Sequence, residues 1–424
     1  DFIDNAKTER EAVEYTKNIA ESNGFLPLSA CSVSSGEKLY YVNNCKSVFY
    51  ARIGSGSLEN GVRLIVAHVD SPRLDLKQLP LFESSGISYF KTHYYGGLKK
   101  YQWTALPLSL HGVIYKADGE KIDICIGEDD DDPVFYITDL MPHIAKDQYD
   151  KTLRDAIPGE TLNIVNGSVP FDDEKGSVKH NILCLLNEKY GITERDFITA
   201  ELSATPAQRS RDVGFDRSMI AAYGQDDRIC AYPAFTALLD SDDSDKTRIV
   251  VFADKEEIGS VGATGMQSRF FENSVAELLD GMGCYSELAL RRALRNSSML
   301  SSDVSAAFDP LYADAFENVV LGEPLLTSDE DFKAVAKAIT DATKEYDDGE
   351  TAICFMGHGT EAESNQVYAK MQQVLSDEGF ENYYVGTVEA EPSLEDVLKA
   401  VGEKEYKKVV LEPLMVVAGD HANN

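Results

Sequence analysis

The chain has 424 residues, which is more than a domain with a single hydrophobic core usually contains. We therefore predict two or three domains. Its formal net charge of −32 argues against binding to nucleic acid or to an anionic membrane surface, because both need clustered Lys and Arg. No run of about 18 apolar residues and no signal segment occurs, so we expect no membrane insertion. The seven cysteines are scattered and form no C-x-x-C pair, which is typical of a reduced, cytoplasmic protein.

The first half of the chain combines helical and strand patterns. Residues 5–22 have the periodicity of an amphipathic helix, and the apolar residues 62–67 predict a short buried strand that ends at His68. From about residue 90 the pattern changes to the alternation of half-buried strands, which predicts a strand-rich inserted domain over 90–210. The acids at 129–132 precede a proline, and we interpret them as a solvated loop rather than a cation site.

A second buried strand, at residues 248–253, leads directly into the acidic segment 254–257. Glycines follow at positions 259, 262 and 265. A phosphate-binding loop is not expected from them, because no G-K-[ST] is present and the preceding carboxylates would repel phosphate.

The last part of the chain has a β-α-β-α-β rhythm. The predicted strands, each with the residue beside its end, are 352–356 with His358, 383–388 with Glu389, and 409–418 with His421. Helices are predicted at 329–344 and 365–375, and Ser393 is expected to cap a further one. This order implies a parallel sheet with right-handed crossovers.

Residue types that bind metal ions lie at four element ends in the first part of the chain. The segments are A-H-V-D-S-P-R-L at 67–74, G-Q-D-D-R at 224–228, D-K-E-E-I-G-S-V-G at 254–262 and S-S-D-V-S-A-A at 301–307. Open α/β sheets place their sites at the carboxyl ends of strands, so we expect these residues to meet in one pocket. A hydrolase with two zinc ions about 3.5–4 Å apart needs His and carboxylate ligands, a bridging carboxylate and another carboxylate as general base. Glu256 and Glu257 suit this division, because neighbouring side chains of an extended segment point apart.

These four segments resemble the aspartyl aminopeptidase family of zinc exopeptidases, over residues 1 to about 317. The resemblance implies an α/β zinc-exopeptidase domain that removes amino-terminal Asp or Glu from peptides with two Zn²⁺ ions. It implies that Asp70 orients a ligating His68 and that Glu256 is the general base. The zinc ligands implied are His68, Asp226, Glu257 and Asp303, with Asp226 bridging the two ions.

The strand-rich insert resembles the dimerisation domain of the same family, so we expect a homo-oligomer that forms through it. Its segment P-H-I-A at 142–145 resembles a stretch that in the family approaches the active site of a neighbouring subunit. His143 is therefore a candidate substrate-binding residue. The alternative is an ordinary surface or core imidazole.

The resemblance to the peptidase ends near residue 317. Members of the family supply a final His ligand near their carboxyl end, and we find no counterpart after Asp303. We therefore expect an incomplete second zinc site, missing strands in the central sheet and a peptidase impaired by truncation.

His358, Glu389 and His421 can converge on one open cation site, because each lies just beyond a strand of one predicted sheet. The motifs around them resemble the anaerobic sirohydrochlorin cobaltochelatase of cobalamin biosynthesis. These motifs are L-G-E-P-L-L at 321–326, M-G-H-G-T-E at 356–361, V-G-T-V-E at 385–389 and P-L-M-V-V-A-G-D-H-A at 413–422. The likeness covers part of that family's carboxyl-terminal domain only. It implies that the three residues hold Co²⁺ before its insertion into a tetrapyrrole.

We therefore predict a catalytic domain of residues 1–89 and 211–317, the insert at 90–210, and a chelatase-like parallel β-α-β domain at 319–424 that is truncated at both ends. The two activities share no substrate, so we interpret the chain as two gene fragments joined at about 317–321 rather than a selected bifunctional enzyme. By coverage the dominant function is the acid-specific zinc aminopeptidase. The alternatives are a cobaltochelatase and a protein that binds metal without a complete active site.

Overall fold

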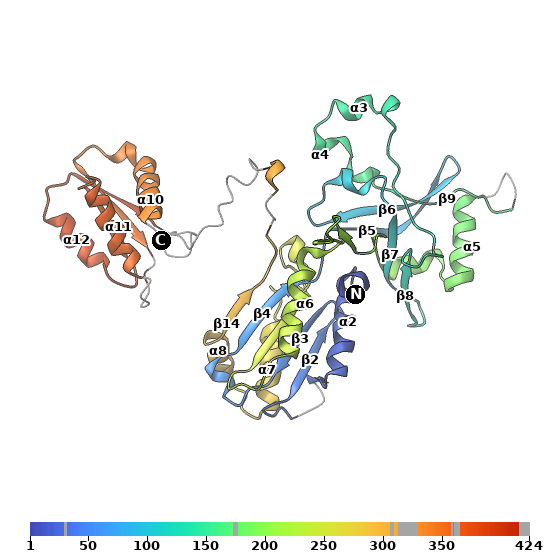
Figure 1. Cartoon of the computed structure of the whole chain (residues 1–424), viewed down its shortest axis with the longest axis horizontal. Coiled ribbons are helices and arrows are strands. Elements are labelled where there is room, and N and C mark those ends of the chain that lie inside the picture. The colour runs from blue at the N-terminus through green and yellow to red at the C-terminus, as the bar shows by residue number, and fades with distance from the viewer. Residues whose placement is uncertain are drawn as a thin grey trace. The chain divides into compact units, whose positions relative to one another are not determined.

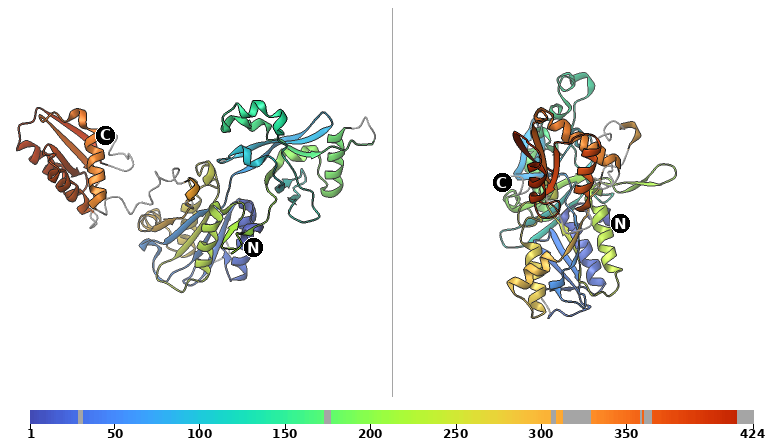
Figure 2. Two further views of the ribbon diagram at one scale, coloured as in Figure 1. Left: turned by 45° about the horizontal axis from the view of Figure 1, so that its top comes forward. Right: turned by 90° about the vertical axis from the view of Figure 1, so that its left-hand side faces the viewer.

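The computed structural model describes residues 1–28, 32–172, 177–305, 309–312, 329–357, 359 and 365–414. The chain divides into two compact units, Asp1–Ser305 and Ala306–Asn424 (Figures 1 and 2). Each unit combines sheets with helices, so the α/β class expected from the sequence is confirmed. No helix among the described residues has the length and apolarity that a membrane span needs.

In its described part, unit 1 contains a six-stranded sheet of mixed direction, in the order β1-β2-β3-β13-β4-β14. Strands β13 and β14 run parallel to β4 on its two sides, and β3 is antiparallel to β13. The carboxyl ends of these three parallel strands therefore lie at one edge. The strands are β1 (Leu26–Pro27), β2 (Lys38–Asn43), β3 (Ser47–Arg52), β4 (Arg63–His68), β13 (Arg248–Ala253) and β14 (Ser298–Ser301).

Helices cover both faces of this sheet (Figure 1). The side chains of a strand alternate between the two faces, so β13 contributes to two cores. Ile249 and Val251 pack with α7 and α8, whereas Val250 and Phe252 pack with α2 and α6. The helices are α1 (Phe2–Asn5), α2 (Glu9–Ser22), α6 (Gln225–Leu239), α7 (Phe270–Gly281) and α8 (Glu287–Arg295).

A second sheet of unit 1 forms the insert, with antiparallel strands in the order β8-β7-β10-β5-β6-β9. Its strands begin at Arg73, whereas the alternation in the sequence indicated residue 90. The reason is that β5 follows β4 closely and pairs with β6 as a long hairpin. The strands are β5 (Arg73–Ser84), β6 (Ile87–Tyr95), β7 (Leu108–Tyr115), β8 (Lys121–Ile126), β9 (Ile164–Gly167) and β10 (Ala200–Pro206). The same region contains α3 (Lys146–Tyr149), α4 (Leu153–Ala156), α5 (Val178–Tyr190) and the hairpin of β11 (Arg211–Val213) and β12 (Met219–Ala221).

Unit 2 contains the predicted parallel sheet, in the order β16-β15-β17. Ile353 and Phe355 of β15 pack in the core with α10 and α11, and Cys354 packs on the opposite face with α12. Ser393 caps α12 as expected, with its hydroxyl accepting from the main-chain N–H of Asp396. The elements are α10 (Asp329–Ala342), β15 (Thr351–Gly357), α11 (Gln366–Asp377), β16 (Tyr383–Thr387), α12 (Leu394–Gly402) and β17 (Lys408–Pro413).

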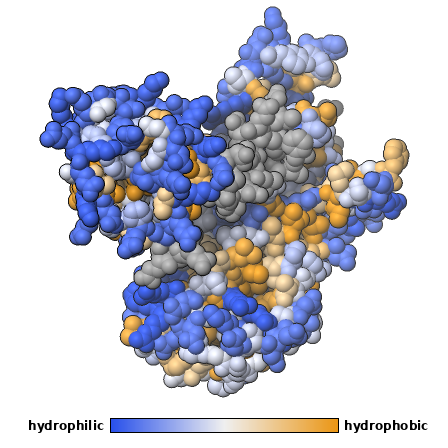
Figure 3. Space-filling model, turned by 60° about the vertical axis from the view of Figure 1, so that its left-hand side comes forward, coloured by the Kyte–Doolittle hydropathy of each residue, from blue (hydrophilic) through white to orange (hydrophobic). Residues whose placement is uncertain are grey.

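The face shown in Figure 3 is mostly hydrophilic, and apolar side chains gather on part of it. Exposed apolar residues of unit 1 include Met299 and Leu300 on the edge strand β14 and Met219 and Ile220 on the β11–β12 hairpin. Exposed apolar groups on strand edges favour pairing with another chain.

Phe197→Ala should lower the free energy of unfolding of the insert by about 3–5 kcal/mol, because it removes a buried ring from the core. The centroid of that ring lies 6.0 Å from the centroid of Phe90. Trp103, the single tryptophan, lies in the same core, so its fluorescence during urea unfolding measures the change. The control is Ile198→Ala at the neighbouring, exposed position, which should change the free energy by less than about 0.5 kcal/mol. Equal effects of the two substitutions would contradict this core assignment.

Candidate metal centre

The ends of three parallel strands bring metal-type residues to one edge of the first sheet. His68 is the last residue of β4, and it is paired with Ala253, the last residue of β13. Strand β14 ends at Ser301 on the other side of β4. The acidic segments that follow β13 and β14 therefore begin beside His68, and the start of α6 places Asp226 against the same ring.

Carboxylates surround the side chain of His68, which is 3% exposed. Its Nε2 lies 3.0 Å from Asp226 Oδ1 and 3.7 Å from both Glu256 Oε2 and Asp303 Oδ1. One ligand atom each of His68, Asp226 and Glu257 lies within 4.8 Å of the other two. The structure thus brings together the residues that the four motifs singled out around His68.

Hydrogen bonds of Asp70 stabilise this arrangement of side chains. The Nδ1–H of His68 donates to the main-chain oxygen of Asp70 at 2.9 Å, which leaves Nε2 facing the carboxylates. Tyr95 Oη donates to Asp70 Oδ2 at 2.6 Å, and the main-chain N–H groups of Glu256 and Glu257 donate to its carboxylate at 3.1 and 3.2 Å. Burial would raise the pKa of Asp70, but the hydrogen bonds with His68 and Tyr95 hold it below its usual value. Asp70 therefore orients both the imidazole and the acidic turn.

Negative charge is concentrated in this site. Burial and the neighbouring Asp226 carboxylate raise the pKa of Glu257 to about 7. For His68, burial lowers the pKa, but the hydrogen bond with Asp70 and the nearby carboxylates outweigh it and raise the pKa to about 9. One imidazole with several carboxylates is a ligand set that fits Zn²⁺, and the charge of the ion would remove the repulsion among the carboxylates.

Asp227 joins this group, although the motif reasoning assigned only its neighbour Asp226. It is buried, and neither of its carboxylate oxygens has a hydrogen-bond partner among the described residues. Ligand atoms of Asp227, His68 and Asp303 lie within 4.8 Å of one another. The signal in the sequence was the second acid of G-Q-D-D-R. Helical periodicity could not predict the direction of the Asp227 side chain, because Asp226 and Asp227 have non-helical backbone angles within the first turn of α6.

The start of α6 is tied to the residues after β4 by Arg228, whose side chain is fully buried. Its Nη1 donates to Ser71 Oγ at 2.8 Å. Its Nη2 donates to the main-chain oxygens of Val69 and Lys7, each at 3.0 Å. These bonds hold the carboxylates of α6 beside the end of β4, and the sequence had not indicated this role.

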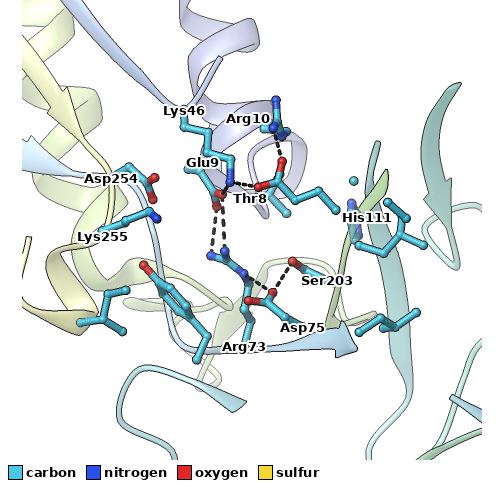
Figure 4. A pocket seen from close by; sticks show the side chains of 17 residues that line it. Thr8, Glu9, Arg10, Lys46, Arg73, Asp75, His111, Ser203, Asp254 and Lys255 are labelled. Atoms are coloured by element: carbon cyan, nitrogen blue, oxygen red, sulfur yellow. Dashed lines mark hydrogen bonds and ion pairs between the residues drawn. The ribbon is translucent and has the colours of Figure 1, made fainter. Parts of the chain in front are cut away.

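A cavity of about 280 Å³ with charged walls adjoins the site, and Figure 4 shows the residues that line it. The guanidinium of Arg73 crosses it, with Nη1 3.0 Å from Glu9 Oε2 and Nε 2.8 Å from Asp75 Oδ1. Ser203 Oγ donates to the same Asp75 oxygen at 2.6 Å. These contacts connect α2 with β5 and β10, and so join the insert to the catalytic part of unit 1.

Two of the other four predicted site residues, His143 and Glu389, belong to the described part of the chain. His143 is exposed on the turn Pro142–Ile144 of the insert and is not in the groups around His68. In unit 2, Glu389 is exposed just after β16, where the main-chain N–H of Val388 donates to the oxygen of Gly357 at the end of β15. His358 and His421 lie outside the described residues.

Residues 2–325 match the family model of the aminopeptidase I zinc metalloprotease (M18). The chain belongs to the M18 aminopeptidase family. A probable M18 family aminopeptidase 1 of Clostridium acetobutylicum is 49% identical over 355 residues, which cover 81% of this chain and 76% of that protein. The protein of the same name in Thermotoga maritima is 46% identical over 320 residues, which cover 75% of this chain and 70% of that protein.

Residues 302–424 match the family model of the cobalt chelatase (CbiK). This match overlaps the M18 match at 302–325, a segment that includes the junction expected at about 317–321. Both resemblances indicated by the motifs are thus confirmed.

Solved structures of M18 aminopeptidases share the fold. The Thermotoga maritima enzyme has a TM-score of 0.72 and 36% identity, covering 99% of this chain and 89% of that one. Aminopeptidase I of Clostridium acetobutylicum has a TM-score of 0.69 and 38% identity, covering 98% and 88%. The S. cerevisiae mApe1 dodecamer, with a TM-score of 0.60 and 19% identity over 98% of this chain and 88% of that one, shares the fold alone.

Asp70→Asn should weaken zinc binding about 10- to 100-fold, because it removes the negative charge 3.3 Å from His68 Nδ1 and replaces one oxygen that accepts from Tyr95 or the acidic turn with an NH₂ group, which can only donate. Competition of the metal-free protein with a chromophoric zinc chelator measures this affinity. Asp118→Asn, in an exposed turn, is the matched control. Equal zinc affinities of the two variants would show that Asp70 does not support metal binding.

Proposed function

We propose that this chain is a zinc-dependent aminopeptidase that removes amino-terminal Asp or Glu from peptides. The observation that carries the proposal is the group of carboxylates around His68 at the ends of three parallel strands. Membership of the M18 family supports aminopeptidase chemistry. The preference for acidic amino-terminal residues is a proposal, because the family match names no substrate preference. We place the protein in the cytoplasm, since each cysteine in the described part of the chain is unpaired.

In this mechanism four residues would hold the metal, and Asp226 would be the ligand shared with a second ion. Zinc supplies, when bound, an electrophilic centre that polarises the scissile carbonyl and acidifies water. Glu256 accepts a proton from the attacking water as the water oxygen bonds to the carbonyl carbon, and it returns the proton to the leaving nitrogen as the C–N bond breaks. Asp70 acts as a positioning residue for His68 and Glu256. The four ligands are His68, Asp226, Glu257 and Asp303.

The division of roles between the two adjacent glutamates follows from their surroundings. The side chain of Glu256 is 47% exposed, so its carboxylate can reach a substrate. Glu257 is less exposed and lies within 4.8 Å of ligand atoms of His68 and Asp226. An exposed base beside a partly buried ligand is the arrangement that metal-assisted hydrolysis needs.

We further propose that one zinc ion binds well and a second binds weakly. The two metal-type groups around His68 in the described residues share its ring, so two ions would compete for one nitrogen. The final histidine that completes the second site by resemblance has no counterpart among the motifs after Asp303. Turnover should therefore be slow even with excess zinc.

The test is hydrolysis of Asp-, Glu- and Leu-anilides in the presence of Zn²⁺. The acidic substrates should be preferred, at rates below the usual range of about 1–10³ s⁻¹. Glu256→Gln should retain bound zinc and lower kcat by a further factor of about 10²–10⁴, whereas Glu277→Gln, exposed on α7, should change neither. Faster hydrolysis of the Leu substrate would refute the acid preference, and an unchanged kcat in Glu256→Gln would refute the assignment of the base.

We also propose a homo-oligomer that forms through the insert, with His143 of the partner subunit near the peptidase site. Met141 and Ile144, which flank His143, are 62% and 64% exposed, and the β11–β12 hairpin exposes further apolar side chains. Such apolar surfaces favour association. The yeast dodecamer shows that the shared fold is compatible with assembly.

A second candidate function, cobaltochelatase activity of unit 2, is favoured by the family match of residues 302–424. The parallel order β16-β15-β17 and the position of Glu389 after β16 support a cation site at the carboxyl edge of that sheet. Co²⁺ would be a substrate there, with a tetrapyrrole as the second substrate.

The double substitution His358→Ala, His421→Ala should abolish Co²⁺ binding in unit 2 and leave zinc at His68 unchanged. His180→Ala, exposed on α5, is the control. Metal content and isothermal titration of the variants measure both sites. Loss of the zinc at His68 would show that one of these imidazoles completes the peptidase site, so that the chain is one adapted enzyme. Metal binding in both places without either activity would favour the alternative of fused fragments that only bind metal.

A further inference from the structure

A second group of metal-type side chains lies where α2 meets the insert sheet. One ligand atom each of Glu11, His111 and Cys125 lies within 4.8 Å of the other two. They come from α2, β7 and β8, and none belongs to the peptidase motifs. His111 and Cys125 are paired directly across the antiparallel strands β7 and β8, so their side chains lie on the same face of the sheet.

The two ring nitrogens of His111, which is 2% exposed, face different carboxylates. Its Nδ1 lies 2.6 Å from Glu11 Oε1, and its Nε2 lies 3.1 Å from Glu128 Oε1 and 2.9 Å from Ser109 Oγ. Glu128 is held in turn by Lys7 Nζ at 2.7 Å. A histidine that binds a metal through one nitrogen usually donates its other N–H to a carboxylate. Glu128 occupies that position, and Nδ1 faces the side on which Glu11 lies.

We propose that Glu11, His111 and Cys125 bind a Zn²⁺-type divalent cation at a site separate from the His68 centre. A carboxylate, an imidazole and a thiolate are the ligand types that zinc prefers. Ligand atoms around a tetrahedral zinc lie about 3.3–3.8 Å apart, so small side-chain movements suffice to close the site. Solvent can supply the fourth ligand, because Cys125 is exposed.

The charges of this site suit a divalent ion. Binding replaces the Nδ1 proton of His111 and the thiol proton of Cys125, so two protons leave for solvent. The Glu11 carboxylate and the Cys125 thiolate then supply two negative charges for the two positive charges of the ion. The cation of Lys7 is already paired with Glu128. Helix α2 packs on the first sheet, whereas β7 and β8 belong to the insert sheet. The ion would therefore link the catalytic part of unit 1 to the insert.

The experiment is a titration of the full chain, stripped of metal by a chelator, with Co²⁺ as the probe. Thiolate ligation to Co²⁺ gives an intense near-ultraviolet charge-transfer band, which carboxylate and imidazole ligands do not give. We expect this band in the unsubstituted chain and its loss in Cys125→Ser. It should persist in Cys284→Ser, another exposed cysteine, and in Cys230→Ser, whose thiol lies beside Asp227.

A second variant separates the loss of a ligand from the loss of the fold. Glu128→Gln should keep the band and weaken Co²⁺ binding about 10- to 100-fold, because Glu128 positions His111 without touching the ion. Metal-free Cys125→Ser should have the same thermal midpoint as the unsubstituted chain, since Cys125 is exposed. Absence of a thiolate band in the unsubstituted chain, or its survival in Cys125→Ser, would overturn the proposal and leave the group as an ion-pair network.

Discussion

The register between β4 and β13 is the constraint on which the candidate metal centre depends. The pairing of Ala253 with His68 makes both strands end at the same level, so the acidic turn after β13 begins beside the imidazole. A slip of one residue would turn each side chain of β13 to the opposite face of the sheet. Val251 and Phe252 are fully buried in the cores on the two faces, and exchanging them would disrupt both. Packing on two faces therefore sets the geometry of a site that lies at the strand ends.

The buried guanidinium groups of unit 1 are stabilised by specific partners rather than by solvent. The buried guanidinium of Arg228 is compensated by main-chain and hydroxyl oxygens, and that of Arg73 by Glu9 and Asp75. Burying a charge without such partners would cost several kcal/mol on an order-of-magnitude scale. The carboxylates around His68 are the exception, because they repel one another. A cation bound there would remove this repulsion, so metal binding would stabilise this edge of the sheet.

The two units are built on separate cores. Among the described residues, each buried apolar cluster draws on one unit only, with β13 at the centre of unit 1 and β15 at the centre of unit 2. The change from M18 likeness to chelatase likeness falls within 302–325, at the boundary between these cores. The two family likenesses therefore correspond to two separately packed units. Its activity depends on whether either site is complete, since function must be argued from sites rather than from fold.

The sequence by itself determined the elements and the families of both parts. Continuous apolar runs predicted β13, β15 and β16, because buried parallel strands leave no polar face. The four motifs identified the residues that meet at His68. Only the tertiary structure decided that Asp227 faces the same ring and that the insert sheet begins at Arg73. It alone brought Glu11 to His111, a hundred residues away in the chain. The physical reason is that periodicity reports which face of one element is buried, whereas contacts between distant elements depend on long-range packing that no local pattern encodes.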